Sequence, residues 1–74
     1  MQAQTQQADD KSLEYIKNGL IGRYAYSADE ASRLVKKYNY SINVWYTDFV
    51  NQVPQHRGID DVVIDIHFDE NFHY

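Results

Sequence analysis

The sequence predicts a mainly α-helical fold, a small three-helix bundle followed by an acidic C-terminal segment. Three stretches between residues 10 and 53 carry apolar residues at three- and four-residue steps, which is the spacing of one helix face. A length of 74 residues fits a single domain, and the absence of cysteine excludes disulfides, thiol catalysis and cysteine-ligated zinc. We therefore expect a disordered, glutamine-rich lead-in over residues 1–8 and one small helical domain over residues 9–74.

The first helix is expected from about Asp10 to Ile21. Its apolar side chains share one face: Leu13, Ile16, Leu20 and Tyr24. Asp9 and Asp10 suit its N-terminal end, because a carboxylate there accepts hydrogen bonds from free amides and interacts favourably with the helix dipole. Gly22 is the predicted stop, since glycine readily adopts the left-handed conformation that ends many helices.

A capping box predicts the start of the second helix: the side chains of Ser27 and Glu30 each accept a hydrogen bond from the other's backbone amide. Apolar residues then follow at helical spacing: Ala31, Leu34, Val35 and Tyr38. Asn39 is the predicted terminator, because asparagine tolerates left-handed geometry better than most residues.

The third helix is expected to begin at Tyr40 or Ser41 and to end before Pro54, which disfavours helical geometry in the residue preceding it. Its apolar stripe is wide: Ile42, Trp45, Tyr46, Phe49, Val50 and Val53. Because a minimal domain needs bulky residues to bury enough area, we expect about half of the aromatic side chains in the core.

The segment after Gly58 fits two conformations. Residues 59, 62, 63 and 66 are apolar at helical spacing, whereas residues 64, 66 and 68 alternate with polar residues as in a half-buried strand. The β-branched run Val62-Val63-Ile64 tips the prediction towards a short strand, with a fourth helix as the alternative. A lone strand has unpaired edges, which a homodimer would supply with a partner.

Charge is divided unevenly along the chain. Residues 1–40 carry six bases and five acids, while residues 41–74 carry six acids and a single base, Arg57. The acidic C-terminal third should repel nucleic acid phosphates and attract a protein with a basic surface.

A helix-turn-helix over residues 27–50 is the alternative reading, as a DNA-binding regulator. Its candidate recognition helix, residues 41–50, contains one acid and no base, although Arg33, Lys36 and Lys37 lie on the preceding helix. A recognition helix reads base edges with basic or amide side chains and rests on phosphate contacts. Nucleic acid is therefore not the expected partner.

Two metal-binding patterns stand near the C-terminus. Asp65, His67 and Asp69 would share one face of a strand, and Glu70 and His73 stand at i, i+3 as in carboxylate-bridged helical bundles. Such bundles need two pairs of this kind plus two further glutamates, so we expect neither a metal nor a cofactor.

Catalysis is not expected. The sequence has no glycine-rich phosphate loop, nucleophile elbow or His-Glu-x-x-His motif, and so short a chain barely encloses a ligand cavity. It also has no run of 18 apolar residues and no signal peptide, so we expect no membrane span. The absence of cysteine fits a reducing cytosol, and we expect a cytoplasmic protein.

These observations predict a small non-catalytic regulatory or adaptor protein that binds another protein, with a small subunit of a larger assembly as a further alternative. The acidic, aromatic-containing C-terminal segment would engage a basic partner surface. Its expected steering and anchoring residues are Asp60, Asp61, Asp65, Asp69 and Glu70, with Phe68, Phe72 and Tyr74. Truncation after Arg57 is expected to abolish partner capture and to leave most of the helicity intact.

Overall fold

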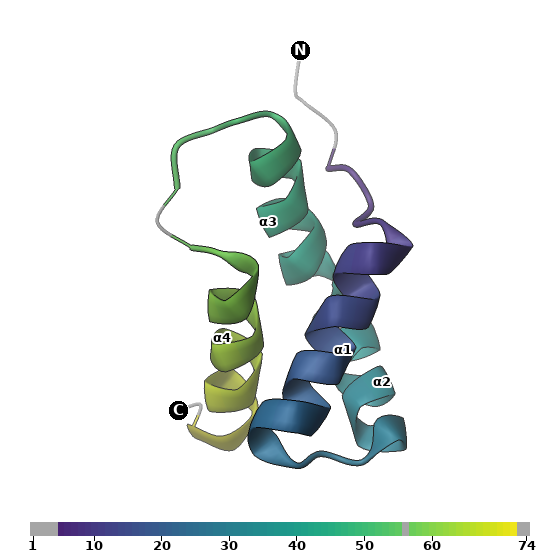
Figure 1. The fold of residues 1–74 in the computed structure, drawn as a ribbon. Helices are drawn as coiled ribbons and strands as arrows, with labels where there is room; N and C mark the ends of the chain where they lie inside the picture. The colour runs from purple at the N-terminus through teal and green to yellow at the C-terminus, as the bar shows by residue number, and fades with distance from the viewer. Residues whose placement is uncertain (1–4, 56, 73–74) are drawn as a thin grey trace.

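Four helices follow one another in the computed structural model, which describes residues 5–55 and 57–72. They are α1 (Asp10–Tyr24), α2 (Ala28–Lys37), α3 (Asn39–Val50) and α4 (Ile59–Phe72). The first helix is the organising element: α1 packs most extensively against α4 and α2, and α2 leads directly into α3 (Figure 1). The mainly helical fold is confirmed, and the described residues contain four helices and no strand.

The strand preferred for the C-terminal segment is wrong, because Ile59–Phe72 is helical. Three of its residues, Val62, Val63 and Ile66, enter the core, so burial outweighs the weak strand propensity of the β-branched run. A helix also satisfies its backbone groups internally, whereas a lone strand leaves them unpaired. The start of α4 is capped by Asp61, whose Oδ2 accepts a hydrogen bond of 2.9 Å from the Gly58 amide.

The two ends of α1 were predicted with unequal success. Asp9 is the N-cap, and its carboxylate accepts a hydrogen bond of 2.9 Å from the Ser12 amide. The predicted stop at Gly22 is wrong: α1 continues to Tyr24 and ends at Ala25, which takes the left-handed conformation with φ of 60°. The amide of Ala25 donates to the Ile21 carbonyl at 3.0 Å, so a non-glycine residue closes this helix.

The connection between α2 and α3 is a single residue, Tyr38, which is shorter than the sequence suggests. Both hydrogen bonds of the Ser27–Glu30 capping box are present. Tyr38 ends α2 and also precedes the first residue of α3, so Asn39 starts a helix and does not terminate one. No side chain caps α3 at this end, and the helix begins at Asn39, earlier than the predicted start at Tyr40 or Ser41.

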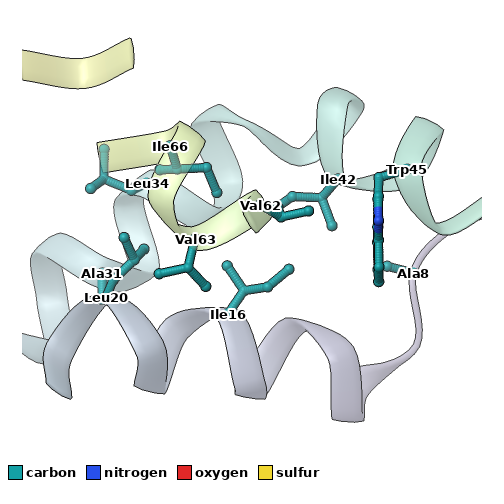
Figure 2. Close-up of a cluster of buried hydrophobic side chains, with 10 residues drawn as sticks. All are labelled: Ala8, Ile16, Leu20, Ala31, Leu34, Ile42, Trp45, Val62, Val63 and Ile66. Carbon is teal, nitrogen blue, oxygen red and sulfur yellow. The ribbon is translucent and has the colours of Figure 1, made fainter. Parts of the chain in front are cut away.

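The core joins all four helices (Figure 2). Trp45 and Ala8 lie at one end of the cluster and Leu34 at the other, with α1 facing α4 between them. The buried side chains are Ala8, Ile16, Leu20, Ala31, Leu34, Ile42, Trp45, Val62, Val63 and Ile66. Buried polar side chains are absent from the part of the chain that the structure describes.

The packed domain begins earlier than the predicted boundary at residue 9. Ala8 is buried, and its amide donates a hydrogen bond of 2.8 Å to Asn43 Oδ1 of α3. The amide of Gln6 donates to Thr47 Oγ1 at 2.6 Å. Residues 1–4 of the predicted lead-in lie outside the described residues.

Gly19 of α1 lies against Val63 of α4. A Cβ at Gly19 would lie 3.0 Å from one Val63 methyl and 3.3 Å from the other, whereas a Cβ at Gly22 would meet nothing within 4 Å. Gly22→Ala should therefore raise the free energy of unfolding by about 0.5–1 kcal/mol through helix propensity. Gly19→Ala brings the same propensity but overpacks the interface, so it should be less stable than Gly22→Ala by about 1–3 kcal/mol. Urea unfolding of both variants measures this difference, and equal stabilities would show that Val63 yields freely.

About half of the described aromatic residues belong to the core or pack on it. Trp45 is buried, and four tyrosines lie partly buried against the core: Tyr24, Tyr26, Tyr38 and Tyr46. The exposed aromatic residues are Tyr15, Tyr40, Phe49, Phe68 and Phe72.

The described residues, 5–55 and 57–72, contain no helix with the length and hydropathy of a membrane span.

Candidate functional site

Helix α4 divides the predicted site residues between its sides. Asp61, Asp65 and Asp69 recur every four residues, and Phe68 and Phe72 stand beside them at the same spacing, so these five share one side of the helix. All five are exposed. Asp60 and Glu70 point to neighbouring helices, and Tyr74 lies outside the described residues.

Asp60 holds α4 to α1. Its Oδ1 accepts a hydrogen bond of 2.8 Å from the Tyr15 hydroxyl and lies 4.0 Å from Arg23 Nη2. The pKa of Tyr15 is raised, because its hydroxyl donates to this carboxylate and experiences its negative charge.

Glu70 holds α4 to α2. Its carboxylate lies 2.6 Å from Lys37 Nζ and 3.5 Å from Arg33 Nη2, and it accepts a hydrogen bond of 2.9 Å from the Tyr38 hydroxyl. The hydrogen bonds from Lys37 and Tyr38, together with the two positive charges, lower the pKa of Glu70. Bases from the first half of the chain therefore neutralise part of the acidic segment from within.

Asp65 carries a more exposed ion pair. Its Oδ2 lies 2.6 Å from Arg57 Nη2, and about half of each side chain is open to solvent. Asp69 lies near Tyr38, whose pKa is raised first by burial of the hydroxyl and then by the carboxylates of Asp69 and Glu70. The carboxylates on the outer side of α4 thus have polar neighbours but stay at the surface.

A groove of about 670 Å³ runs between α3 and α4. Its apolar floor consists of the buried side chains Ile42, Val62 and Ile66. Phe68 and Phe72 form its α4 wall and are 52% and 56% exposed. The remaining lining residues are Tyr38, Ser41, Arg57, Asp65 and Asp69.

The two phenylalanines are held in place by an aromatic cluster. Their ring centroids lie 5.4 Å apart, and His67 contacts both rings edge-on at 5.5 and 6.4 Å. His67 in turn stacks on Tyr24 of α1 at 3.7 Å, and its Nδ1 lies 2.9 Å from the Tyr26 hydroxyl. The apolar wall of the groove is therefore anchored to the core side of α4.

The shared face that a strand would have given Asp65, His67 and Asp69 does not form. Asp65, His67 and Asp69 follow at two-residue steps, which a helix directs to different sides, and His67 packs on Tyr24. Among the described residues, no three His, Asp or Glu side chains are placed to hold a metal ion. The partner proposed for Glu70, His73, lies outside those residues.

The α2–α3 pair carries bases on α2 alone. The exposed residues of α3 include Tyr40 and Val44 but no base, and two of the three bases of α2, Arg33 and Lys37, are paired with Glu70. The helix expected to read DNA therefore has no arginine or lysine with which to contact phosphates.

The sequence reading missed the α3 side of the groove. Tyr38, Ser41 and Ile42 line it: Tyr38 directly precedes α3, and Ser41 and Ile42 lie in the first turn of α3. In the sequence, Tyr38 and Ile42 belong to the apolar sides of two different predicted helices and Ser41 is only a possible helix start, so no pattern joins the three.

No protein-family model matches the chain, and no curated protein or solved structure shows significant similarity to it.

Proposed function

We propose that this chain is a small non-catalytic adaptor that binds a basic, amphipathic segment of another protein in the α3–α4 groove. One observation carries the proposal: Phe68 and Phe72 are exposed side by side above an apolar floor, next to a row of carboxylates on the same helix. Apolar anchors lying in a groove are a recurring mode of helix recognition.

The apolar part of the site is suited to supply the binding energy. Aromatic side chains dominate interface energetics because each buries a large area with little conformational freedom to lose. Both phenylalanines are already ordered by His67, which reduces the entropy lost when a partner binds.

The acidic part of the site is suited to select and orient the partner. Asp65 and Asp69 line the groove, Asp61 lies one turn before them on the same side of α4, and the chain carries a net charge of −4. The Arg57–Asp65 pair is exposed, and such pairs contribute only about 0–1 kcal/mol, so a partner's lysine or arginine can replace Arg57 with little loss.

The apolar contribution is tested with a fluorescent model peptide of leucine and lysine whose leucines recur at i, i+3, i+4 and i+7. We expect Phe68→Ala with Phe72→Ala to weaken binding by about 30-fold or more, since truncating an anchor residue costs about 2 kcal/mol. Tyr40→Ala is the matched control, because Tyr40 is an aromatic residue that is 74% exposed and lies outside the groove. An equal loss in the Tyr40 variant, measured by fluorescence anisotropy, would contradict the proposal.

Charge selectivity is tested with a second peptide in which glutamate replaces every lysine. The wild-type protein should prefer the lysine peptide, and Asp65→Asn with Asp69→Asn should reduce this preference and its dependence on ionic strength. Glu14→Gln with Asp29→Asn, at exposed positions on α1 and α2, is the control for net charge, because it also removes two negative charges. Equal binding of both peptides would contradict the proposal that the partner is basic.

Truncation after Arg57 does not separate binding from folding. It removes α4 and with it Val62, Val63 and Ile66 of the core, so the helicity expected to survive should be lost as well. Substitutions at exposed positions are the sharper test.

A further inference from the structure

Helix α3 and its C-terminal cap carry a row of short polar side chains. The row consists of Asn39, Asn43, Thr47 and Asn51, which recur at four-residue steps, and we call it the polar row. Residues at this spacing follow one another along one side of a helix. Ser41, which lines the α3–α4 groove, is two residues from Asn43, so the groove and the polar row occupy different sides of α3.

The segment before α1 is bonded to the polar row. Residues 5–8, which we call the N-terminal strap, form no helix, strand or turn. The Gln6 amide donates a hydrogen bond of 2.6 Å to Thr47 Oγ1, and the Ala8 amide donates one of 2.8 Å to Asn43 Oδ1. Two residues of extended chain span about 6.6 Å and four residues of helix span about 6 Å. Alternate residues of the strap therefore match successive members of the row.

Both acceptors are oriented by bonds within α3. The Thr47 hydroxyl donates to the Asn43 carbonyl at 2.8 Å, and Asn43 Nδ2 donates to Asn39 Oδ1 at 3.0 Å. These bonds do not involve the N-terminal strap, so they persist when the strap is absent from the row. The polar row is therefore preorganised to accept backbone amides, which reduces the entropy lost when they bind.

Few other contacts hold the N-terminal strap. Residues 5–7 are exposed, and only the Ala8 side chain is buried, beside Trp45 at one end of the core (Figure 2). Asp9 belongs to α1, because its carboxylate accepts from the Ser12 amide and its carbonyl accepts from the Leu13 amide at 3.1 Å. The cap of α1 therefore does not need the strap. Two hydrogen bonds and one buried methyl group are comparable in free energy to the entropy cost of ordering four residues.

We propose that the N-terminal strap is a reversible latch, which docks on the polar row of α3 and releases from it while the four helices stay folded. Docking covers Trp45, which is 5% exposed. Release uncovers the Trp45 ring together with Asn43 Oδ1 and Thr47 Oγ1, two acceptors suited to backbone amides. The latch thus opens and covers a face of α3 that is separate from the α3–α4 groove, and it does not depend on the adaptor function.

Native-state hydrogen exchange of the full chain, measured with and without low urea, tests the latch. The amides of Gln6 and Ala8 should exchange about tenfold more slowly than in an unstructured peptide. Urea should not accelerate them, because release of the strap exposes little surface. The amides of Leu20 and Val63 should be slowed by about 100-fold or more and should respond to urea, since they open with the core. Strap amides that behave like these core amides, or that show no protection, would overturn the proposal.

A pair of substitutions at Thr47 tests how the strap docks. Thr47→Val removes the acceptor of the Gln6 amide and keeps the branched shape of the side chain, so it should abolish the protection of Gln6 and leave that of Leu20 unchanged. Thr47→Ser keeps the hydroxyl and should retain the protection. Equal protection of Gln6 in the two variants would show that the strap does not dock through the polar row.

The fluorescence of Trp45, the single tryptophan of the chain, reports release directly. Ala8→Asp should shift the emission to longer wavelength and increase quenching by acrylamide, because an unpaired carboxylate cannot be buried beside the ring, while far-UV helicity is retained. Gln7→Asp, at an exposed position of the strap, adds the same charge and should leave the emission unchanged. Loss of helicity in Ala8→Asp, or equal emission from the two variants, would overturn the latch.

Discussion

Replacing Trp45 with alanine should lower the free energy of unfolding by about 3–5 kcal/mol, the range measured for large aromatic residues in cores. Trp45 is buried beside Ala8 at one end of the core (Figure 2). Its ring stacks on Phe49, and its Nε1 donates a hydrogen bond of 3.0 Å to the Arg57 carbonyl. It therefore connects α3 both to the N-terminal segment and to the loop before α4. Because domains of this size rarely exceed about 3–5 kcal/mol of core stability, the variant should be largely unfolded.

The Trp45 prediction is measured by urea unfolding followed by far-UV circular dichroism. Trp45→Phe is the control: it keeps an aromatic ring in the core but removes the hydrogen bond to Arg57, so it should lose less than the alanine variant. A loss below about 1 kcal/mol for Trp45→Ala would mean that α3 is not held through this ring.

Leu34→Ala should lower the free energy of unfolding by about 2–5 kcal/mol, through lost apolar contacts and the cavity that remains. Leu34 is fully buried, and with Ala31 it is one of the two buried residues of α2. This helix has 10 residues, which is too short to be stable alone, so tertiary packing must hold it. Loss of Leu34 should therefore loosen α2 and the Lys37–Glu70 contact that joins it to α4.

Hydrogen exchange and urea unfolding together check the Leu34 prediction. Lys36→Ala, on the exposed side of the same helix, should change stability by no more than about 0.5 kcal/mol. If Leu34→Ala and Lys36→Ala lower the free energy of unfolding by the same amount, the stability of α2 does not depend on its buried face.

Local features of the fold were readable from the sequence. Asp9, Ser27 and Glu30 cap the helices they were expected to cap, because a capping hydrogen bond spans only three residues. The end of α1 depends on distant partners: Tyr24 extends the helix past Gly22 and stacks on His67 of α4. The conformation of Val62-Val63-Ile64 likewise depends on Gly19, whose missing side chain lets α4 approach α1.

The charge asymmetry drew attention to α4 but did not reveal the contacts of its carboxylates within the chain. Asp60 contacts Tyr15 and Arg23, and Glu70 contacts Lys37, over separations of at least 33 residues that no local spacing reveals. The order of charges along the chain suggests two separate surfaces. In the structure, however, α4 packs directly against α1. The side of α4 that bears Asp61, Asp65 and Asp69 became distinguishable only once the segment was known to be helical.

A nuclear magnetic resonance titration of the isotope-labelled protein with the leucine–lysine peptide shows directly whether a partner binds in the α3–α4 groove. The α3–α4 groove predicts that backbone amide shifts concentrate at Ser41, Ile42, Ile66, Phe68 and Phe72, while the exposed side of α1 around Glu14 and Asn18 stays unchanged. Shifts centred on α1, or no saturable shifts at all, would contradict the assignment of this groove as a protein-binding site.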